Sequence, residues 1–131
     1  LPGDAVVIRY LGPKGRFGPA AFTFQKEVAR MTLADKRAII TDGRFSGGTT
    51  GLSIGYLAPE AAIKGPLAAV EEGDEIYVNV KDRVIRMEVS DEAIADRLGK
   101  IDWKLEESKF KPFLRMFARN VTSTAKGATW I

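Results

Sequence analysis

A segment rich in glycine follows directly on a short apolar stretch of the chain. Its ten residues, Asp42-Gly-Arg-Phe-Ser-Gly-Gly-Thr-Thr-Gly51, include four glycines, and the preceding residues 37–41 read Arg-Ala-Ile-Ile-Thr. The β-branched residues and the turn signal Asp42-Gly43 predict a buried strand that ends at Thr41. Glycine has no side chain that could fill a core. These glycines are therefore expected to allow a backbone conformation that other residues avoid, or to let another group approach the backbone closely. The sequence therefore predicts a buried strand that carries this loop at its carboxyl end.

The rest of the chain predicts a mixed α/β fold. Apolar alternation and β-branched runs predict further strands at residues 5–10, 75–80 and 83–89, of which the last two form a hairpin. Helix start and stop signals predict helices at residues 22–33, 59–64, 91–98 and 111–120. We expect one domain over residues 1–131, with a barrel-like sheet and helices packed on it. Six apolar side chains are expected to be buried: Ile39, Ile40, Val78, Val80, Val84 and Phe117.

Composition restricts the chemistry that the chain supports. The 131 residues are 45% hydrophobic and 28% charged, in the range of one compact domain with its own core. Apolar runs fall far short of the roughly 20 residues that span a bilayer, so we expect no membrane partner. The sequence has no cysteine and no histidine, which excludes a disulfide, a thiolate-held cluster and an imidazole base within this chain. Carboxylates, lysine, tyrosine and an activated hydroxyl remain for catalysis.

The two ends of the chain carry separate signals. The chain opens with Leu-Pro-Gly-Asp rather than with methionine, so we expect it to be cut from a longer protein. The formal net charge is +3, and basic residues gather in the C-terminal part, with few acids after Glu107. Nucleic-acid binding by this part is one alternative, and it predicts an affinity that falls steeply with salt. We favour a solvated helix face and expect no nucleic-acid partner.

An ordered series of motifs runs through nearly the whole chain. It starts with Ile8-Arg9-Tyr10 and Gly12-Pro13-Lys14-Gly15, and it centres on Ile39-Ile-Thr-Asp-Gly-Arg-Phe-Ser-Gly-Gly-Thr49. It continues with Gly51-Leu-Ser-Ile-Gly55, Pro59-Glu-Ala-Ala62, Glu72-Gly-Asp74, Val89-Ser-Asp-Glu92 and Ser123-Thr-Ala-Lys-Gly-Ala128. Such a series is far more specific than a single glycine-rich match. It resembles the C-terminal part of the dihydroxy-acid dehydratase and phosphogluconate dehydratase family, and its dihydroxy-acid members most closely.

The resemblance implies a swivelling β/β/α domain that docks on a larger N-terminal dehydratase domain, which this sequence lacks. In the family that domain holds an iron–sulfur cluster and magnesium, so this chain alone is expected to bind no cofactor and to be inactive. The implied reaction dehydrates a 2,3-dihydroxy carboxylate: a base takes the C2 proton, cluster iron assists departure of the C3 hydroxyl, and the enol becomes a 2-keto acid. The family further implies branched-chain amino-acid synthesis, a homodimer, and the cytoplasm or a eukaryotic organelle matrix.

Ser46 is the catalytic residue that the resemblance implies, because the serine of the Gly-Arg-Phe-Ser-Gly-Gly loop is the base proposed for the family. A serine hydroxyl is a weak base, so this role requires a nearby cation or metal that stabilises the alkoxide. Gly47, Gly48 and Thr49 are expected to bind the substrate, with backbone N–H groups directed at its carboxylate. The alternative is a structural turn whose serine caps a helix or hydrogen-bonds the loop.

Two positions depart from the family pattern. The family carries a metal-binding glutamate shortly after Gly-Pro-Lys-Gly, where this chain has Ala20 and Ala21. Glu27 takes the place of this glutamate only if an insertion before it and a deletion after it bring it into register with the family pattern. The other interpretation is that Glu27 is an exposed acidic residue on a helix face. Tyr56 stands where the family has histidine, and tyrosine does not ionise near neutral pH. A divergent sugar-acid dehydratase and a non-catalytic binding or regulatory domain therefore stay open as alternatives.

Three further polar residues lie within the motifs, and each has a structural interpretation beside a functional one. Asp42 is typical of a turn, and Arg44 of a surface or interdomain ion pair. Glu60 is typical of an acid in the first turn of a helix, where it complements the dipole. The sequence leaves open whether these residues contribute to the site.

Overall fold

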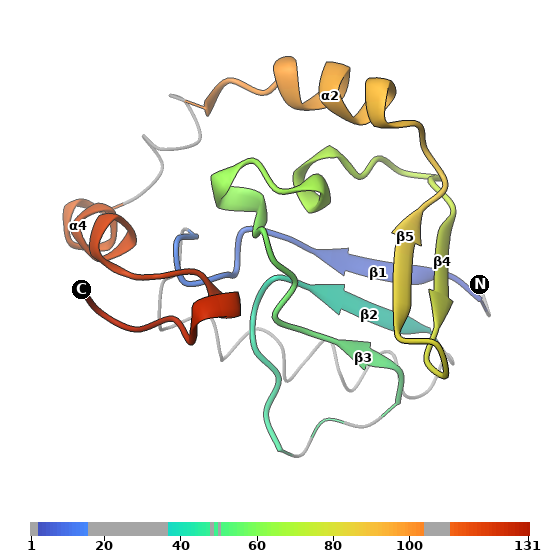
Figure 1. The fold of residues 1–131 in the computed structure, drawn as a ribbon, viewed down its shortest axis with the longest axis horizontal. Helices are drawn as coiled ribbons and strands as arrows, with labels where there is room; N and C mark the ends of the chain where they lie inside the picture. Colours follow the sequence, from blue (N-terminus) through green and yellow to red (C-terminus); the bar gives the residue numbers. More distant parts are fainter. Residues whose placement is uncertain (1–2, 16–36, 48, 50, 104–110) are drawn as a thin grey trace.

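In the computed structural model, residues 3–15, 37–47, 49, 51–103 and 111–131 are described (Figure 1). The described residues form short strands in two sheets, two α-helices and three single 3-10 turns, which confirms the mixed α/β class. None of their helices is long and apolar enough to cross a membrane. Several sequence predictions concern positions outside these ranges, namely the helix at 22–33, Ala20, Ala21, Glu27 and Gly48.

The core sheet consists of three parallel strands, β1 (Ala5–Ile8), β2 (Ala38–Thr41) and β3 (Ser53–Ile54), in that order. The middle strand is β2, and its Ile39 and Ile40 are almost fully buried, as predicted. Because the strands are parallel, their carboxyl ends lie at one edge of the sheet. The loops that follow β1, β2 and β3 all leave from this edge (Figure 1).

The predicted hairpin is present as β4 (Ile76–Asn79) and β5 (Val84–Met87), paired antiparallel. Val78 is partly buried, but Val80 is 71% exposed and Val84 37% exposed, so their predicted burial is wrong. The pairing of β4 with β5 stops before Val80. Val84 lies on the exposed face of β5, the face that also carries the polar side chain of this strand. The two sheets stay separate within the described residues, so the expected barrel is not closed there.

The helix predicted over residues 59–64 is instead a single 3-10 turn, η2 (Ala61–Ile63), and a second 3-10 turn, η3 (Pro66–Ala69), follows Gly65. The first turn ends because Lys64 adopts a left-handed conformation, with φ of 65°. Behind it, the Gly65 N–H donates to the Glu60 carbonyl at 3.0 Å. A side chain at Gly65 would overlap the Pro59 carbonyl, so this tight reversal requires glycine.

The two α-helices begin close to the predicted positions. Helix α2 (Asp91–Gly99) is capped by Ser90, whose Oγ accepts the Ala93 N–H at 3.2 Å. Helix α4 (Pro112–Asn120) begins with proline in its first turn, and the turn η4 (Thr124–Lys126) follows it. Phe117 of α4, which was predicted to be buried, is only partly buried.

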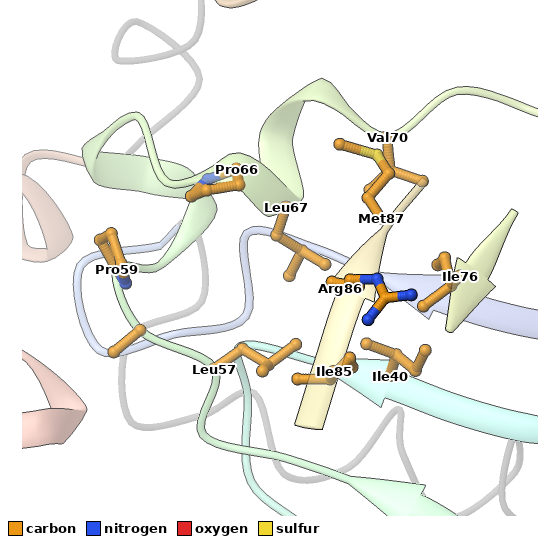
Figure 2. Close-up of a pocket in the computed structure, with 11 residues that line it drawn as sticks. Ile40, Leu57, Pro59, Pro66, Leu67, Val70, Ile76, Ile85, Arg86 and Met87 are labelled. Carbon is orange, nitrogen blue, oxygen red and sulfur yellow. The ribbon is translucent and has the colours of Figure 1, made fainter. Parts of the chain in front are cut away.

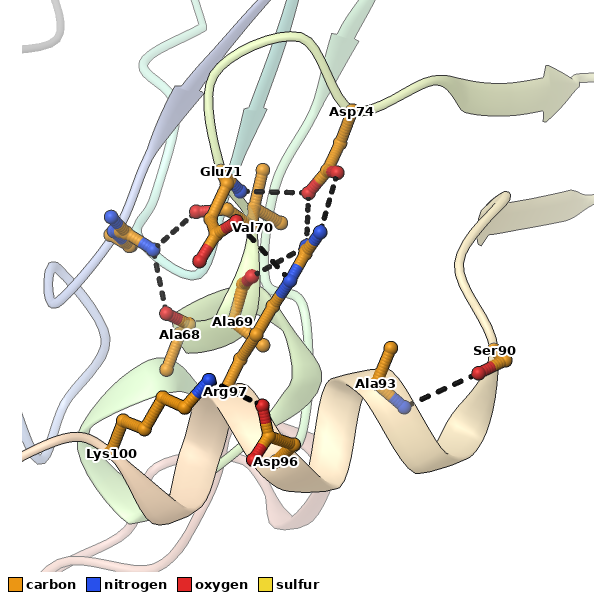
Figure 3. Close-up of polar contacts among 11 residues, drawn as sticks. Ala68, Ala69, Val70, Glu71, Asp74, Ser90, Ala93, Asp96, Arg97 and Lys100 are labelled. Atoms are coloured by element: carbon orange, nitrogen blue, oxygen red, sulfur yellow. Dashed lines mark hydrogen bonds and ion pairs between the residues drawn. The ribbon is translucent and has the colours of Figure 1, made fainter.

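Helix α2 is tied to the turn before β4 by an arginine, as Figure 3 shows. The Arg97 guanidinium binds both carboxylate oxygens of Asp74, at 2.6 and 3.1 Å, and its Nη1 also donates to the Ala69 carbonyl at 3.1 Å. Arg9 donates from the opposite side to the Ala68 and Val70 carbonyls, at 2.6 and 2.8 Å. The two arginines therefore hold the end of η3 between β1 and α2.

Candidate functional site

The carboxyl edge of the parallel sheet brings together the loops that carry most of the motif residues. The Tyr56 N–H after β3 donates to the Gly43 carbonyl after β2 at 2.9 Å. The Lys14 Nζ in the loop after β1 donates to the Ala118 carbonyl of α4 at 2.9 Å. The Thr124 Oγ1 of η4 lies 3.4 Å from the Tyr56 carbonyl. Segments from both halves of the sequence thus form one end of the molecule (Figure 1).

Asp42, the first residue after β2, is a fully buried carboxylate that joins three segments. Its Oδ1 accepts the Leu11 N–H at 2.9 Å, and its Oδ2 accepts the N–H groups of Tyr10 and Ala61 at 3.1 and 2.9 Å. Burial raises the pKa of Asp42 above its usual value, although these three donors favour the charged form. The side chain therefore does more than form a local turn, because it fixes the loops after β1 and β3 against β2.

Glu60 is a second fully buried carboxylate at the same edge. Its Oε2 accepts the Lys14 N–H at 2.9 Å, and no described group is within hydrogen-bonding distance of its Oε1. The pKa of Glu60 is raised to about 7, chiefly by burial and also by the charge of Asp42, against the lowering effect of the Lys14 N–H. A side chain at Gly12 would overlap Oε2, so the close approach requires glycine. Glu60 makes no helix-cap hydrogen bond, so its interpretation as a first-turn acid is wrong.

Ser46 lies in the loop beyond the carboxyl end of β2, as the sequence predicted. Its side chain is partly exposed, and its Oγ is 3.4 Å from the Thr49 Oγ1. The Thr49 N–H donates to the Ser46 carbonyl at 3.0 Å, so in this conformation that N–H is used within the loop. Gly47 is exposed, and a side chain there would meet no atom within 4 Å, so open space adjoins Ser46 at this point of the loop.

The Ser46 loop is anchored at its base by packing that the sequence pattern did not reveal. A side chain at Gly55, after β3, would clash with the Phe45 ring at 2.8 Å, so glycine is required for this ring to pack there. Tyr56 adopts a left-handed conformation with φ of 59°, and its side chain is 54% exposed. Arg44 is exposed, which agrees with a surface role. The residues at the base are held in place, whereas the tip is accessible.

The described residues of this edge do not by themselves form a metal or cluster site. The sequence offers no thiolate or imidazole, and within the described ranges no three acidic side chains gather where they could hold a metal. Beneath the surface, both oxygens of Asp42 accept backbone N–H groups, whereas Glu60 accepts one such group through its Oε2. Their contacts make them supports for the loops rather than ligands or bases that reach a substrate.

A separate cavity of about 230 Å³ lies between β2, the segment 57–70 and the hairpin (Figure 2). Apolar side chains such as Ile40, Leu67 and Ile85 line most of it. Among the described residues that line it, Arg86 is the one with a charged side chain, which pairs with Glu88 at 2.8 Å and lies over the Tyr77 ring. This cavity offers apolar space without a group suited to acid–base chemistry, so the carboxyl edge is the better candidate site.

Comparison with known proteins identifies relatives of this chain. Residues 1–128 match the family described as dihydroxy-acid/6-phosphogluconate dehydratase C-terminal. A dihydroxy-acid dehydratase of Aquifex aeolicus is 45% identical over 130 residues, which cover 97% of this chain and 23% of the relative. The dihydroxy-acid dehydratase of Desulfatibacillum aliphaticivorans is 46% identical over 130 residues, covering 96% of this chain and 23% of the relative.

A third relative gives the same result. The dihydroxy-acid dehydratase of Methanosphaera stadtmanae is 43% identical over 134 residues, covering 98% of this chain and again 23% of the relative. The chain thus spans about a quarter of the length of these curated relatives. The family that the ordered motifs indicated is confirmed, and this chain belongs to the dihydroxy-acid/6-phosphogluconate dehydratase family, whose C-terminal domain it matches.

Proposed function

We propose that this chain is the C-terminal domain of a dehydratase that converts a 2,3-dihydroxy carboxylate into a 2-keto acid, and that Ser46 acts as its base. The observation that carries the proposal is the Ser46 loop, which leaves the carboxyl edge of the sheet and is anchored at its base. The family membership supports the reaction class, because the curated relatives are named dihydroxy-acid dehydratases.

The reaction needs a proton acceptor at C2 of the substrate. The Ser46 oxygen accepts the C2 proton, the C–H electron pair forms the C2–C3 double bond, and hydroxide leaves C3. The enol then gains a proton at C3 and loses the proton of its C2 hydroxyl, which gives the 2-keto acid. The proton taken by Ser46 combines with the departed hydroxide, so the net change is the loss of one water molecule. Thr49, whose hydroxyl is 3.4 Å from the Ser46 oxygen, is suited to orient that oxygen and to contact the substrate.

Ser46 requires activation by groups that the described part of this chain does not supply. A hydroxyl becomes a base only where a cation stabilises its ionised form. The sequence has no thiolate, and the described residues contain no group of acidic side chains that could hold a metal. We therefore assign the groups that activate Ser46 and take up the departing hydroxide to the remainder of the longer protein. The partner domain, a homodimer and a place in branched-chain amino-acid synthesis are further parts of the same proposal, which the resemblance to the family implies.

A direct assay of the full-length protein tests this function. The protein is purified without oxygen, and metal analysis checks that it contains bound metal. It is then incubated with a branched 2,3-dihydroxy acid or with 6-phosphogluconate. The 2-keto acid formed is then measured as its phenylhydrazone. We expect turnover of the dihydroxy acid to exceed that of the phosphosugar acid. Preferred turnover of 6-phosphogluconate would favour the sugar-acid alternative, and no keto acid from either compound would favour a non-catalytic domain.

A further inference from the structure

Tyr56 is an exposed aromatic residue in a backbone conformation that bulky side chains seldom adopt. Its φ is 59°, in the left-handed region, and it is 54% exposed. A bulky residue with positive φ is uncommon, and such strain persists only where the surrounding contacts impose it. Residues of this kind are concentrated at binding sites. The position therefore raises the question of what the tyrosine side chain does.

The contacts that hold Tyr56 in this conformation involve its backbone. Its N–H donates to the Gly43 carbonyl at 2.9 Å, and its carbonyl lies 3.4 Å from the Thr124 Oγ1. One contact comes from the loop after β2 and the other from η4, so the residue is fixed from two sides. Neither contact depends on the phenol ring. They explain the backbone of Tyr56 but not why the side chain is aromatic.

Tyr10 provides an internal comparison, because it has the same side chain and a similar φ of 66° in the loop after β1. The Tyr10 ring is partly buried and packs against the core cluster that contains Ile40. Its N–H donates to the Asp42 carboxylate at 3.1 Å. Core packing thus accounts for an aromatic residue at Tyr10. Tyr56 is not part of that cluster and is mostly exposed, so core packing does not account for it.

Tyr56 is next to the base of the Ser46 loop. A side chain at Gly55 would meet the Phe45 ring at 2.8 Å and the Gly43 carbonyl at 3.2 Å, so the loops after β2 and β3 are in contact there. Phe45 directly precedes Ser46, and Gly55 directly precedes Tyr56. Ser46 and Tyr56 are therefore each one residue, about 3.8 Å along the chain, from the same contact. A small carboxylate bound at Ser46 would lie beside Tyr56.

The groups around Ser46 differ in polarity. Thr49 offers a hydroxyl 3.4 Å from the Ser46 oxygen, and Gly47 adjoins open space. The Tyr56 ring adds an apolar surface, and aromatic rings bury a large apolar area when a ligand covers them. The substrate of the proposed reaction is divided in the same way. Its carbons C1 to C3 carry the carboxylate and the two hydroxyls, whereas substituents on C3 are alkyl groups in a branched acid.

We propose that the Tyr56 ring contacts the alkyl substituents on C3 of the substrate and thereby selects branched 2,3-dihydroxy acids over unbranched ones. This inference rests on the proposed function, in which the substrate binds beside Ser46. The ring acts through apolar contact, and the phenol hydroxyl is not required for it. Tyr56 is thus a residue that determines specificity, and it takes no part in the proton transfer assigned to Ser46.

Isothermal titration calorimetry of the full-length, metal-loaded protein tests this contact apart from turnover. Every protein carries Ser46→Ala, so that the ligands are not consumed. The probes are 2,3-dihydroxy-3-methylbutanoate, with two methyl groups on C3, and 2,3-dihydroxypropanoate, with none. Tyr56→Ala should raise the Kd of the branched acid by about tenfold or more and that of the unbranched acid by less than about threefold, since one lost methylene contact changes binding by roughly tenfold or more. Alanine keeps the Cβ, so the backbone strain at this position is unchanged.

Two further variants separate the ring from other effects. Tyr56→Phe keeps the ring and should preserve the ratio of the two Kd values. Tyr77→Ala, which removes a 39% exposed tyrosine on the hairpin, is the matched control and should alter neither Kd. An equal rise of both Kd values in Tyr56→Ala would indicate a general disturbance of the site, and a changed ratio in Tyr56→Phe would assign the contact to the hydroxyl. Either result would overturn the inference.

The same titrations distinguish failure of this inference from failure of the proposed reaction. If neither acid binds when Tyr56 is present, or if Tyr56→Ala leaves both Kd values unchanged, the ring contact is refuted. If the predicted difference between the two acids is found, the contact stands even where the protein with Ser46 intact forms no 2-keto acid. In that case it is the reaction that fails.

Discussion

Replacing Glu60 by Gln should remove a pH dependence of stability that the buried carboxyl creates. The pKa of Glu60 rises from 4.5 to about 7 on folding, because burial disfavours the charged form. A raised pKa stabilises the folded state fully below pH 4.5, and the contribution is lost as pH rises through about 7. One pKa unit corresponds to about 1.4 kcal/mol, so the loss amounts to roughly 3 kcal/mol by pH 8. Glutamine keeps the shape of the protonated acid without this loss.

Urea unfolding of the 131-residue chain, followed by tryptophan fluorescence at several pH values between 4.5 and 8, measures this effect. The free energy of unfolding of the wild type should fall relative to Glu60→Gln by about 3 kcal/mol across that range. Glu72→Gln, at an exposed position, is the control for the loss of one acidic side chain. A constant difference between the wild type and Glu60→Gln would refute the reasoning. If the wild type instead gains stability relative to the variant as pH rises, folding favours the charged form of Glu60 rather than the neutral form.

Three further substitutions test the contacts that build the edge and its supports. Gly12→Ala places a methyl group on Glu60 and should cost about 2 kcal/mol in urea unfolding; an equal cost in a Glu60→Ala background would show that this overlap is not the cause. Ile40→Ala should cost about 2–5 kcal/mol, since Ile40 is 1% exposed in the core cluster, and a smaller loss would indicate that the adjoining cavity collapses. Arg97→Met should lower the melting temperature measured by calorimetry, because Asp74 loses its bidentate partner, and an unchanged melting temperature would contradict this support.

The strands and caps were predictable because their signals are local. Ile39 and Ile40 form an apolar stretch that ends in a turn signal, and Ser90 precedes an acidic first turn that it caps. Val80 was misjudged because alternation continues one residue beyond the point where pairing stops. Position in the pattern shows which face a side chain takes, but not where the strand leaves its partner.

The carboxylate supports were not predictable because their partners are remote in sequence. Glu60 sits in a Pro-Glu-Ala segment that resembles a helix start, yet it binds the Lys14 N–H, 46 residues away. Asp42 was identified as a turn residue, whereas its side chain binds Leu11 and Ala61 from two other segments. The loop position of Ser46 was predictable from the strand before it. Its role as a base stays a prediction, since it came from the family motif.

Turnover of Ser46→Ala in the full-length protein tests the central claim most directly. The rate constant for 2-keto acid formation should fall by at least about a hundredfold, the lower end of the usual loss when a general base is removed. Metal content and the unfolding transition should match the wild type, because Ser46 is a partly exposed loop residue whose hydroxyl contacts only Thr49 among the described side chains. A Thr49→Val variant tests whether the loss is specific to the base, and it should retain more turnover than Ser46→Ala. Near-normal turnover of Ser46→Ala would contradict the account and leave Ser46 as a structural residue of a glycine-rich turn.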